Sequence, residues 1–413
     1  MLAVKYSKIK SEIGSCFYVA NIEKFINNYN LLLNSFQRYY SKTSIAYSYK
    51  TNYLPSFCKA VLNNGGFAEV VSDMEADLAL NVGVPPDKIF FNGPFKDKIY
   101  LKKFLRLGGT VNIDCFEEFL QIIEISKSLK SKCSVGVRCN FNIFDGTVSR
   151  FGFDSEDNTI RNVLDRILTE PYLNFTGLHC HFASRSQESW RNAANQMCNF
   201  ISTLTTQQKK SLKYVSLGGG LYGDMHPALG DQLAQSIPTF DDYASISASQ
   251  FYKCVEKNQL SDVTLIIEPG TALSANALEF VTEIQSVKNV RGEVYVTTNG
   301  SSFNIGTAKS TVNLPFEIIN FSSKDELIDL KDAKIVGYTC IETDILHSSF
   351  SGSVAIGDLL VFKEAGSYSI VMKPPFILPN VAIVELSDNG TVHKVLKRAE
   401  TFNDIFSTYD LQI

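Results

Sequence analysis

Residues 45–52 read IAYSYKTN, a β-type run that ends on Lys50 before the chain turns polar. The aliphatic and aromatic residues of this run predict a buried strand. A lysine is almost never fully buried without a partner or a function. Two interpretations of Lys50 are open: its ammonium reaches solvent or a salt-bridge partner at the strand end, or its amine holds a cofactor aldehyde.

The chain up to about residue 271 repeats a pattern of strand, turn and helix. Helical spacing of apolar residues appears at 22–39, 54–62, 75–80, 117–129 and 160–168. The strand-like runs are 44–50, 67–71, 88–93, 110–114, 134–141, 175–182, 214–218 and 263–268. Alternating strands and helices predict a parallel sheet, and eight such units are the number that closes a (β/α)₈ TIM barrel. A doubly wound open sheet fits the pattern as well.

After residue 271 the helical segments become rare and strands dominate. The strand-like runs there are 278–284, 292–298, 334–338, 358–362 and 381–386. They predict a C-terminal all-β domain, a small barrel or sandwich, which also takes in the N-terminal strand at 16–19. A chain of 413 residues exceeds what one core usually organises. We expect a cofactor-binding barrel at 22–272 and a β domain made of 1–21 and 273–413.

Composition restricts the classes of function. The chain is 45% hydrophobic and 20% charged with a net charge of −4, which is typical of a globular protein and disfavours binding to nucleic acid or an anionic membrane. It has no signal-peptide pattern and no apolar run long enough to span a bilayer, so we expect a cytoplasmic protein. The nine scattered cysteines lack C-x-x-C spacing, and His179 and His181 have no evident further ligands, so we predict no metal site.

The ends of the eight strands carry an unusual number of polar residues. Enzymes with this barrel place their working residues at the carboxyl ends of the strands. The ends are Lys50, Glu69, Asn92, Asp114, Arg138 to Asn140, His181, Gly218 to Gly220, and Glu268 to Gly270. Glycines in the seventh and eighth loops suit an anion bound by backbone N–H groups.

A lysine and a glycine-lined anion site together indicate pyridoxal 5′-phosphate. This cofactor attracts electrons only while its pyridine nitrogen stays protonated, and Glu268 is placed to pair with that nitrogen. His181 would stack on the ring face, although a hydrogen-bonded core histidine is the alternative.

Several short motifs occur in the order found in one known family. They are YSYKTN at 47–52, AEVVS at 68–72 with Glu75, GLHCHFAS at 177–184, LGGG at 217–220, EPG at 268–270, Cys340 with Asp344, GSY at 366–368 and KRAETFND at 397–404. In these motifs, from about residue 15 to 410, the chain resembles the fold-type III pyridoxal-phosphate decarboxylases, the ornithine and diaminopimelate decarboxylase family with an alanine-racemase-like barrel.

The resemblance implies a homodimer with shared active sites and assigns roles to individual residues. Lys50 would bond to the cofactor aldehyde, His181 would stack on the ring, and Cys340 from the partner chain would protonate the product. The cofactor-binding set implied is Lys50, Glu69, His181, Ser184, Gly218, Gly219, Gly220, Glu268, Gly270 and Tyr368. The candidate substrate contacts are Asn299, Cys340, Glu342, Asp344 and Arg150.

Departures from the family pattern concern anion and substrate recognition. Thr271 stands where the family has arginine after E-P-G, so Arg185 or Arg150 would have to compensate. Asn299 and Ile341 replace two acids that would meet a distal ammonium, and Glu342 lies one position further on.

We therefore expect decarboxylation of the α-carboxylate of an amino acid or amino-acid conjugate in a specialised biosynthetic pathway. Diaminopimelate decarboxylase is the alternative within enzymes, and a non-catalytic regulator with the same fold is the alternative of another class. Glu268 disfavours a racemase, because alanine-type racemases give the pyridine nitrogen a cationic partner.

Overall fold

The computed structural model describes residues 2–233, 236–260, 262–306, 312–321, 326–386 and 392–411. The chain forms two compact units. One comprises Met1–Phe25, Asp224–Ser236 and Leu273–Ile413, and the other comprises Ile26–Gly223 and Ile237–Ala272. The first unit includes a segment, Asp224–Ser236, that the sequence analysis assigned to the barrel. The domain boundaries drawn from the sequence remain predictions.

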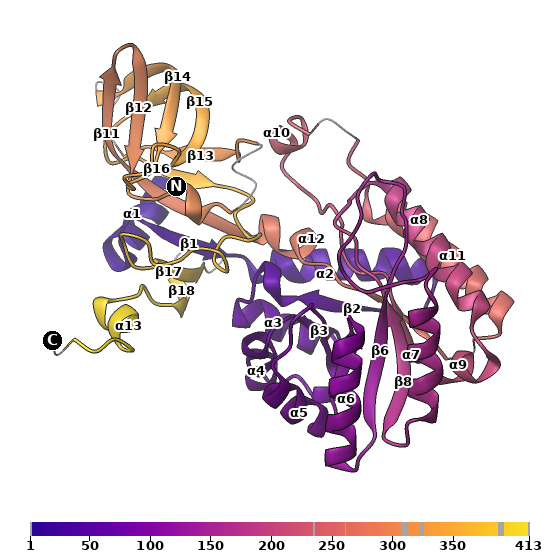
Figure 1. Ribbon diagram of the computed structural model, residues 1–413. Coiled ribbons are helices and arrows are strands. Elements are labelled where there is room, and N and C mark those ends of the chain that lie inside the picture. The colour runs from indigo at the N-terminus through magenta and orange to yellow at the C-terminus, as the bar shows by residue number, and fades with distance from the viewer. Residues whose placement is uncertain are drawn as a thin grey trace. The chain divides into compact units, whose positions relative to one another are not determined.

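The second unit is a closed barrel of eight parallel strands (Figure 1). The strands are β2 (Thr43–Ser48), β3 (Phe67–Val70), β4 (Ile89–Phe91), β5 (Thr110–Ile113), β6 (Cys133–Asn140), β8 (Leu173–His179), β9 (Tyr214–Ser216) and β10 (Thr264–Ile267). They pair in this order, and β10 pairs with β2 in the register Leu265 to Thr43, which closes the sheet. The eight predicted strands and the TIM barrel are confirmed, and the open sheet is excluded. A short strand, β7 (Phe153–Asp154), pairs with the end of β6.

Helices surround this barrel and turn their apolar faces toward it. They are α2 (Ile22–Tyr39), α3 (Pro55–Asn63), α4 (Asp73–Asn81), α5 (Lys98–Arg106), α6 (Phe116–Leu129), α7 (Asn158–Thr169), α8 (Gln187–Thr203), α9 (Thr206–Ser211) and α11 (Phe240–Asn258). In α7 the buried residues are Ile160, Val163, Leu164 and Ile167, the spacing of one helix face. The five helical segments predicted from the sequence are therefore confirmed.

Aromatic packing fills the barrel interior. The rings of Phe90 and Tyr214 lie 4.6 Å apart between centroids, within a buried cluster that includes Ala46 and Ile266. A Cβ at Gly177 would lie 2.2 Å from Tyr214 Cζ, so the absence of a side chain there makes room for the tyrosine ring. The close packing fixes the strands whose ends carry the polar residues.

The first unit is built mainly on β-strands, as predicted, and its strands pair both antiparallel and parallel. Its strands are β1 (Phe17–Ala20), β11 (Leu278–Val290), β12 (Glu293–Thr298), β13 (Phe316–Ile319), β14 (Ile328–Val336), β15 (Ile345–Val354), β16 (Leu359–Phe362), β17 (Ala382–Leu386) and β18 (Val392–Lys397). The N-terminal strand β1 lies between β11 and β17, which confirms its place in the β domain. The remaining helices include α1 (Leu2–Ile13), α10 (Pro227–Gly230), α12 (Thr271–Ser274) and α13 (Phe402–Phe406). Tyr6 and Ile9 of α1 enter the core of this unit.

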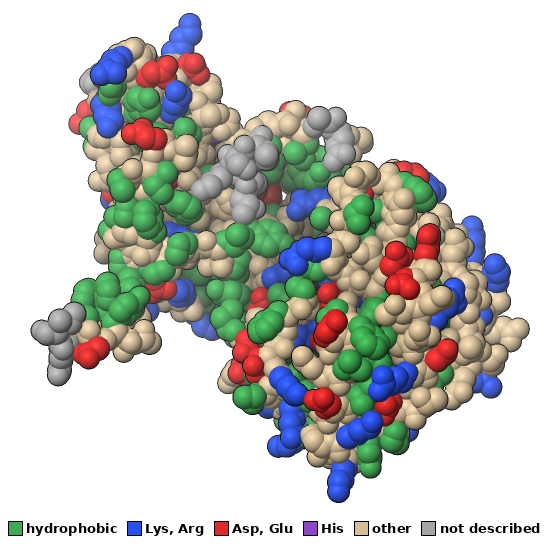
Figure 2. Space-filling model, in the orientation of Figure 1, with side chains coloured by type: hydrophobic (Ala, Val, Ile, Leu, Met, Phe, Trp, Pro, Cys, Tyr) green, Lys and Arg blue, Asp and Glu red, His purple; other side chains and the backbone are tan. Residues whose placement is uncertain are grey.

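The visible face of the barrel unit shows no dominant charge (Figure 2). Figure 2 shows acidic and basic side chains interspersed over the visible face of the barrel unit, in keeping with the net charge of −4. Among the described residues, no helix combines the length and the apolar character needed to cross a bilayer.

Candidate active site

Lys50 lies at the carboxyl end of β2, in a single 3₁₀ turn formed by Tyr49–Thr51. Its Nζ donates to Ser48 Oγ at 2.9 Å and to Glu69 Oε2 at 2.5 Å. Ser48 also donates to Glu69, whose side chain is only 1% exposed, whereas the Lys50 side chain is 30% exposed. A buried carboxylate at the end of β3 thus orients an amine that a small molecule can reach.

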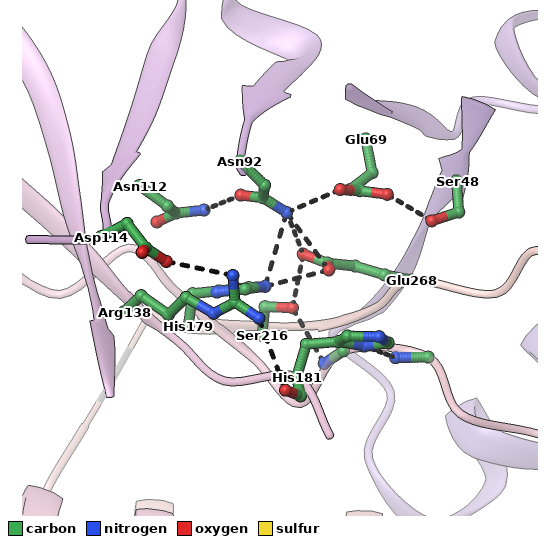
Figure 3. Close-up of polar contacts among 12 residues, drawn as sticks. Ser48, Glu69, Asn92, Asn112, Asp114, Arg138, His179, His181, Ser216 and Glu268 are labelled. Atoms are coloured by element: carbon green, nitrogen blue, oxygen red, sulfur yellow. Dashed lines mark hydrogen bonds and ion pairs between the residues drawn. The ribbon is translucent and has the colours of Figure 1, made fainter. Parts of the chain in front are cut away.

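Glu268, directly after β10, is a second buried carboxylate at the same barrel end (Figure 3). Its Oε1 accepts a hydrogen bond from Ser216 Oγ at 2.7 Å, and its Oε2 lies 3.0 Å from His179 Nε2. Burial acts to raise the pKa of Glu268, but the attraction and hydrogen bond of His179, together with Lys50 and Ser216, lower the pKa to about 2. Glu268 is therefore anionic at neutral pH and suits a cationic ring nitrogen.

Asn92, at the end of β4, connects the two buried carboxylates. Its Nδ2 lies 3.1 Å from Glu69 Oε1 and 3.3 Å from both carboxylate oxygens of Glu268 (Figure 3). Asn112 Nδ2 donates to Asn92 Oδ1 at 2.7 Å, which fixes the orientation of the bridging amide. The bridge separates two negative charges that would otherwise repel each other at close range.

His181 is half-buried in the loop after β8. Its Nδ1 accepts a hydrogen bond from the backbone N–H of Gly219 at 3.1 Å. Burial, and then the positive charge of Lys50, lower the pKa of His181 to about 3, so the imidazole is neutral at physiological pH. Arg138, ion-paired with Asp114 at 3.1 Å, lies with Nη2 3.5 Å from the backbone oxygen of His181. A neutral, fixed imidazole is suited to stacking on an aromatic ring.

Two glycine-containing loops, after β9 and after β10, pack closely against neighbouring backbone at this barrel end. A Cβ at Gly219 would lie 1.7 Å from the Glu268 carbonyl oxygen, and one at Gly220 would lie 2.7 Å from that of Ser184. Gly218 adopts a left-handed φ of +72°, and a Cβ at Gly270 would lie 2.0 Å from Thr51 Oγ1. Side chains cannot enter here, so an anion would meet backbone N–H groups and the half-buried Ser184, whose hydroxyl donates to Ser189 at 2.7 Å.

These observations fit pyridoxal 5′-phosphate. The site offers an amine for the aldehyde, a buried anion for the pyridine nitrogen, a neutral imidazole for the ring and side-chain-free loops for the phosphate. The buried Nδ1 of His179 has no hydrogen-bond partner among the described residues, so the hydrogen-bonding capacity of this imidazole is not fully used by the protein.

The other predicted residues lie in the β unit or at the barrel surface. Cys340 and Glu342 are exposed in the loop between β14 and β15, and Tyr368 is half-buried with a left-handed φ of 53°. Arg150 is exposed in the barrel unit, with its guanidinium 4.2 Å from the Phe151 ring centroid. The roles of these residues remain predictions.

Asp344 and Asn299 are engaged in internal hydrogen bonds of the β unit. The buried Asp344 carboxylate accepts bonds from Ser301 Oγ (3.0 Å), Ser302 N (2.7 Å), Thr339 N (3.2 Å) and Thr339 Oγ1 (2.7 Å). Asp344 therefore shapes the Cys340 loop. Asn299 Oδ1 accepts bonds from Thr282 Oγ1 (2.9 Å) and Glu283 N (2.8 Å), and Nδ2 donates to Ser15 Oγ (2.8 Å).

Sequence reasoning gave no role to four residues of the barrel network: Asn92, Asn112, His179 and Ser216. Asn92 stood among the strand ends and could have been found there. His179 was considered only as a metal ligand, and its contact with Glu268 joins residues 89 positions apart. No local pattern reveals such a pair.

Residues 24–275 match the family model described as "Pyridoxal-dependent decarboxylase, pyridoxal binding domain". The chain belongs to the pyridoxal-dependent decarboxylases. As a member of this family it uses pyridoxal phosphate and is an amino-acid carboxy-lyase. The resemblance identified from the motifs is thereby confirmed, as are the decarboxylase activity and the cofactor.

Several relatives of this decarboxylase are known. The diaminopimelate decarboxylase of Methanocaldococcus jannaschii is 25% identical, covering 97% of this chain and 92% of the relative. Its crystal structure in co-complex with L-lysine has a TM-score of 0.85 at 25% identity and covers 98% of this chain and 94% of that one. The L-glutamyl-[BtrI acyl-carrier protein] decarboxylase of Niallia circulans is 23% identical, covering 82% of this chain and 81% of the relative.

Proposed function

We propose that this pyridoxal-dependent decarboxylase acts on an amino acid whose side chain ends without a free ammonium group, such as an amino acid conjugated through its distal end. The single observation that carries this proposal is the state of the polar groups near Cys340. The Asp344 carboxylate accepts hydrogen bonds from Ser301, Ser302 and Thr339, the Asn299 amide makes three hydrogen bonds within the β unit, and Ile341 is apolar. A distal ammonium needs a carboxylate that is open to it.

Glu342 is the remaining acid of the segment 340–344, and its side chain is exposed. If Glu342 received a distal ammonium, Glu342→Gln would raise KM for a diamino acid by roughly 10-fold or more, the worth of one charge-assisted hydrogen bond. The proposal predicts that this variant keeps the KM of the wild-type protein for its preferred substrate. Asp329, which is also exposed in the β unit, provides the matched control Asp329→Asn.

Diaminopimelate is the second candidate substrate. It is favoured by relatives that bear the name diaminopimelate decarboxylase and align with nearly the whole chain. The Niallia circulans relative supports the first candidate, because its name specifies a glutamyl group attached to a carrier protein. Relatives of similar identity bear the names of both substrate classes, so identity does not separate the two candidates. The polar groups around positions 299 and 341–344 favour the conjugated amino acid.

When bound, pyridoxal phosphate supplies a ring that accepts the electron pair left behind by departing CO₂. The residues of this chain prepare that step. Glu69 Oε2 lies 2.5 Å from Lys50 Nζ and can take the proton that the amine loses on reacting with an aldehyde. Anionic Glu268 keeps a proton on a ring nitrogen, and neutral His181 limits ring movement without adding a competing positive charge.

We assign Cys340 as the acid that returns a proton to the product carbon, because the resemblance to the family implies this role and the thiol is exposed on its loop. We further propose a homodimer in which Cys340 serves the barrel of the partner subunit. Mixing inactive Lys50→Ala and Cys340→Ala chains should then restore up to about a quarter of the sites by random exchange. Absence of recovery after demonstrated subunit exchange would refute shared sites.

Measurement of CO₂ release over a defined panel tests the substrate proposal. The panel comprises meso-diaminopimelate, L-ornithine, L-lysine, L-glutamate, and glutamate conjugated at its γ-carboxylate to an amine or a pantetheine thiol. We expect the highest kcat/KM for a conjugate. The highest kcat/KM for meso-diaminopimelate would establish the second candidate instead.

A further inference from the structure

Arg185 is anchored at the point where the loops after β8, β9 and β10 come together. It follows Ser184 and precedes Ser186, the N-cap of α8. Its Nη2 lies 3.4 Å from Thr271 Oγ1, and its guanidinium lies 5.3 Å from the centroid of the Tyr222 ring. Tyr243 OH donates to the backbone oxygen of Arg185 at 2.5 Å. Both the main chain and the head group of this arginine therefore have defined positions.

The charge of Arg185 has no acidic counterpart in the part of the chain that the structure describes. The ion pairs there include Arg138 with Asp114 and Arg191 with Glu188, but none formed by Arg185. A guanidinium carries five N–H donors, and the long contact to the Thr271 hydroxyl uses one of them weakly. A half-buried cation with spare donors is suited to binding an anion.

The backbone beside Arg185 leaves no room for side chains at two glycines. A Cβ at Gly220 would lie 2.7 Å from the Ser184 carbonyl oxygen, and one at Gly223 would lie 2.5 Å from that of Ala272. Ser184, which is also half-buried, contributes a hydroxyl beside Arg185. Backbone, hydroxyl and guanidinium donors are the groups that together bind phosphate in proteins.

We propose that Arg185 binds the phosphate group of pyridoxal phosphate, with Thr271 Oγ1 orienting its guanidinium. The guanidinium that meets the phosphate comes from the loop after β8, whereas the loop after β10 presents a hydroxyl at Thr271. Arg185 thus compensates for the missing arginine, whereas Arg150 is exposed and stacks on Phe151. This proposal rests on the family's cofactor and is independent of the proposed substrate.

The two positions should compensate for each other. An arginine at 271 beside Arg185 would place two cations together, so Thr271→Arg alone should improve cofactor affinity little. In an Arg185→Gln background, the guanidinium introduced by Thr271→Arg would meet no repulsion from a second cation. We expect Thr271→Arg to recover most of the affinity lost in Arg185→Gln, a strong departure from additivity.

The test is titration of the cofactor-free protein with pyridoxal phosphate and, in parallel, with pyridoxal, followed by absorbance. Arg185→Gln should weaken pyridoxal phosphate binding roughly 10- to 100-fold, the worth of charge-assisted hydrogen bonds to phosphate, and should leave pyridoxal binding unchanged. Arg185→Lys should bind pyridoxal phosphate with an affinity between those of the wild-type protein and Arg185→Gln. Arg191→Gln, which removes an exposed positive charge from α8, is the matched control and should bind both compounds like the wild-type protein.

Three outcomes would overturn the proposal. Equal loss of affinity for pyridoxal phosphate and pyridoxal would indicate that Arg185 only supports the fold, and thermal unfolding of each variant would reveal this independently. An unchanged affinity for both compounds combined with a raised KM for the amino acid would assign Arg185 to a substrate carboxylate. Failure of the double variant Arg185→Gln, Thr271→Arg to regain affinity above the single variant would refute the compensation.

Discussion

Replacing Glu268 by glutamine tests the electrostatic design of the barrel site. The substitution keeps the shape of the side chain and removes its charge. Burial acts to raise the pKa of Glu268, but His179, Lys50 and Ser216 lower the pKa and hold the carboxylate in its charged form. A neutral amide offers no comparable attraction to a protonated ring nitrogen, so about 3 kcal/mol, the upper value for a hydrogen bond to a charged group, is removed from the decarboxylation step.

A change of about 3 kcal/mol in the activation free energy lowers the rate roughly 100-fold. The assay is CO₂ release with the best substrate of the panel, at saturating substrate and with cofactor occupancy determined by absorbance. Glu117→Gln, a neutralised exposed carboxylate in the first turn of α6, is the control and should retain wild-type kcat. If Glu268→Gln with full cofactor occupancy stayed within about twofold of the wild-type kcat, the assigned role of the anion would be wrong.

Three further predictions concern the electrostatics and support of the site. Burial raises the pKa of Glu75 to about 7, so the contribution of this residue to stability is full below about pH 4.5 and is lost as pH rises through 7. Glu75→Gln should remove up to about 3 kcal/mol of this pH dependence in urea unfolding, and an unchanged pH profile would contradict it. Asp344→Ala should lower the free energy of unfolding by about 2–4 kcal/mol because it leaves buried donors unpaired, and an unaltered Tm would argue against this. Asn92→Asp should destabilise the protein at pH 8 by placing a third carboxylate beside Glu69 and Glu268, with a smaller effect at pH 4; equal effects at both pH values would refute repulsion as the cause.

The barrel and the polar residues at its strand ends were predictable because buried parallel strands produce continuous apolar runs that end abruptly in polar residues. Lys50, Glu69 and Glu268 stand at such ends, and the structure brings Lys50 and Glu69 into direct contact. The strand pattern also located β1 and β11 in the β unit. These features could be predicted from short stretches of sequence, because the burial of a strand residue can be inferred from the residues next to it.

Other features depend on contacts between distant residues. Strand β15 reads ILHSSFSGSV and is largely polar, so periodicity did not reveal it; β13, β18 and helix α1 were also missed. Two of the four hydrogen bonds that the Asp344 carboxylate accepts come from Ser301 and Ser302, more than 40 positions away. From the sequence alone Asp344 looked available to a substrate, and only its partners show that its carboxylate is already engaged.

The proposed compensation between Arg185 and Thr271 also depends on a contact between distant residues. The sequence showed that an arginine was missing at 271 and left two candidates to replace it. Arg150 and Arg185 could not be distinguished by sequence alone, because both lie in loops that follow barrel strands. The 3.4 Å contact between Arg185 and Thr271, across 86 positions, separates them.

The central claim is that the amine of Lys50 holds pyridoxal phosphate at the carboxyl end of the barrel. The most direct measurement is borohydride reduction of the cofactor-loaded protein, followed by peptide mapping by mass spectrometry. We predict one pyridoxyl phosphate group per chain, attached to the peptide that contains Lys50, and no attachment in Lys50→Ala. Attachment to another lysine, or an equal amount in Lys50→Ala, would contradict the account.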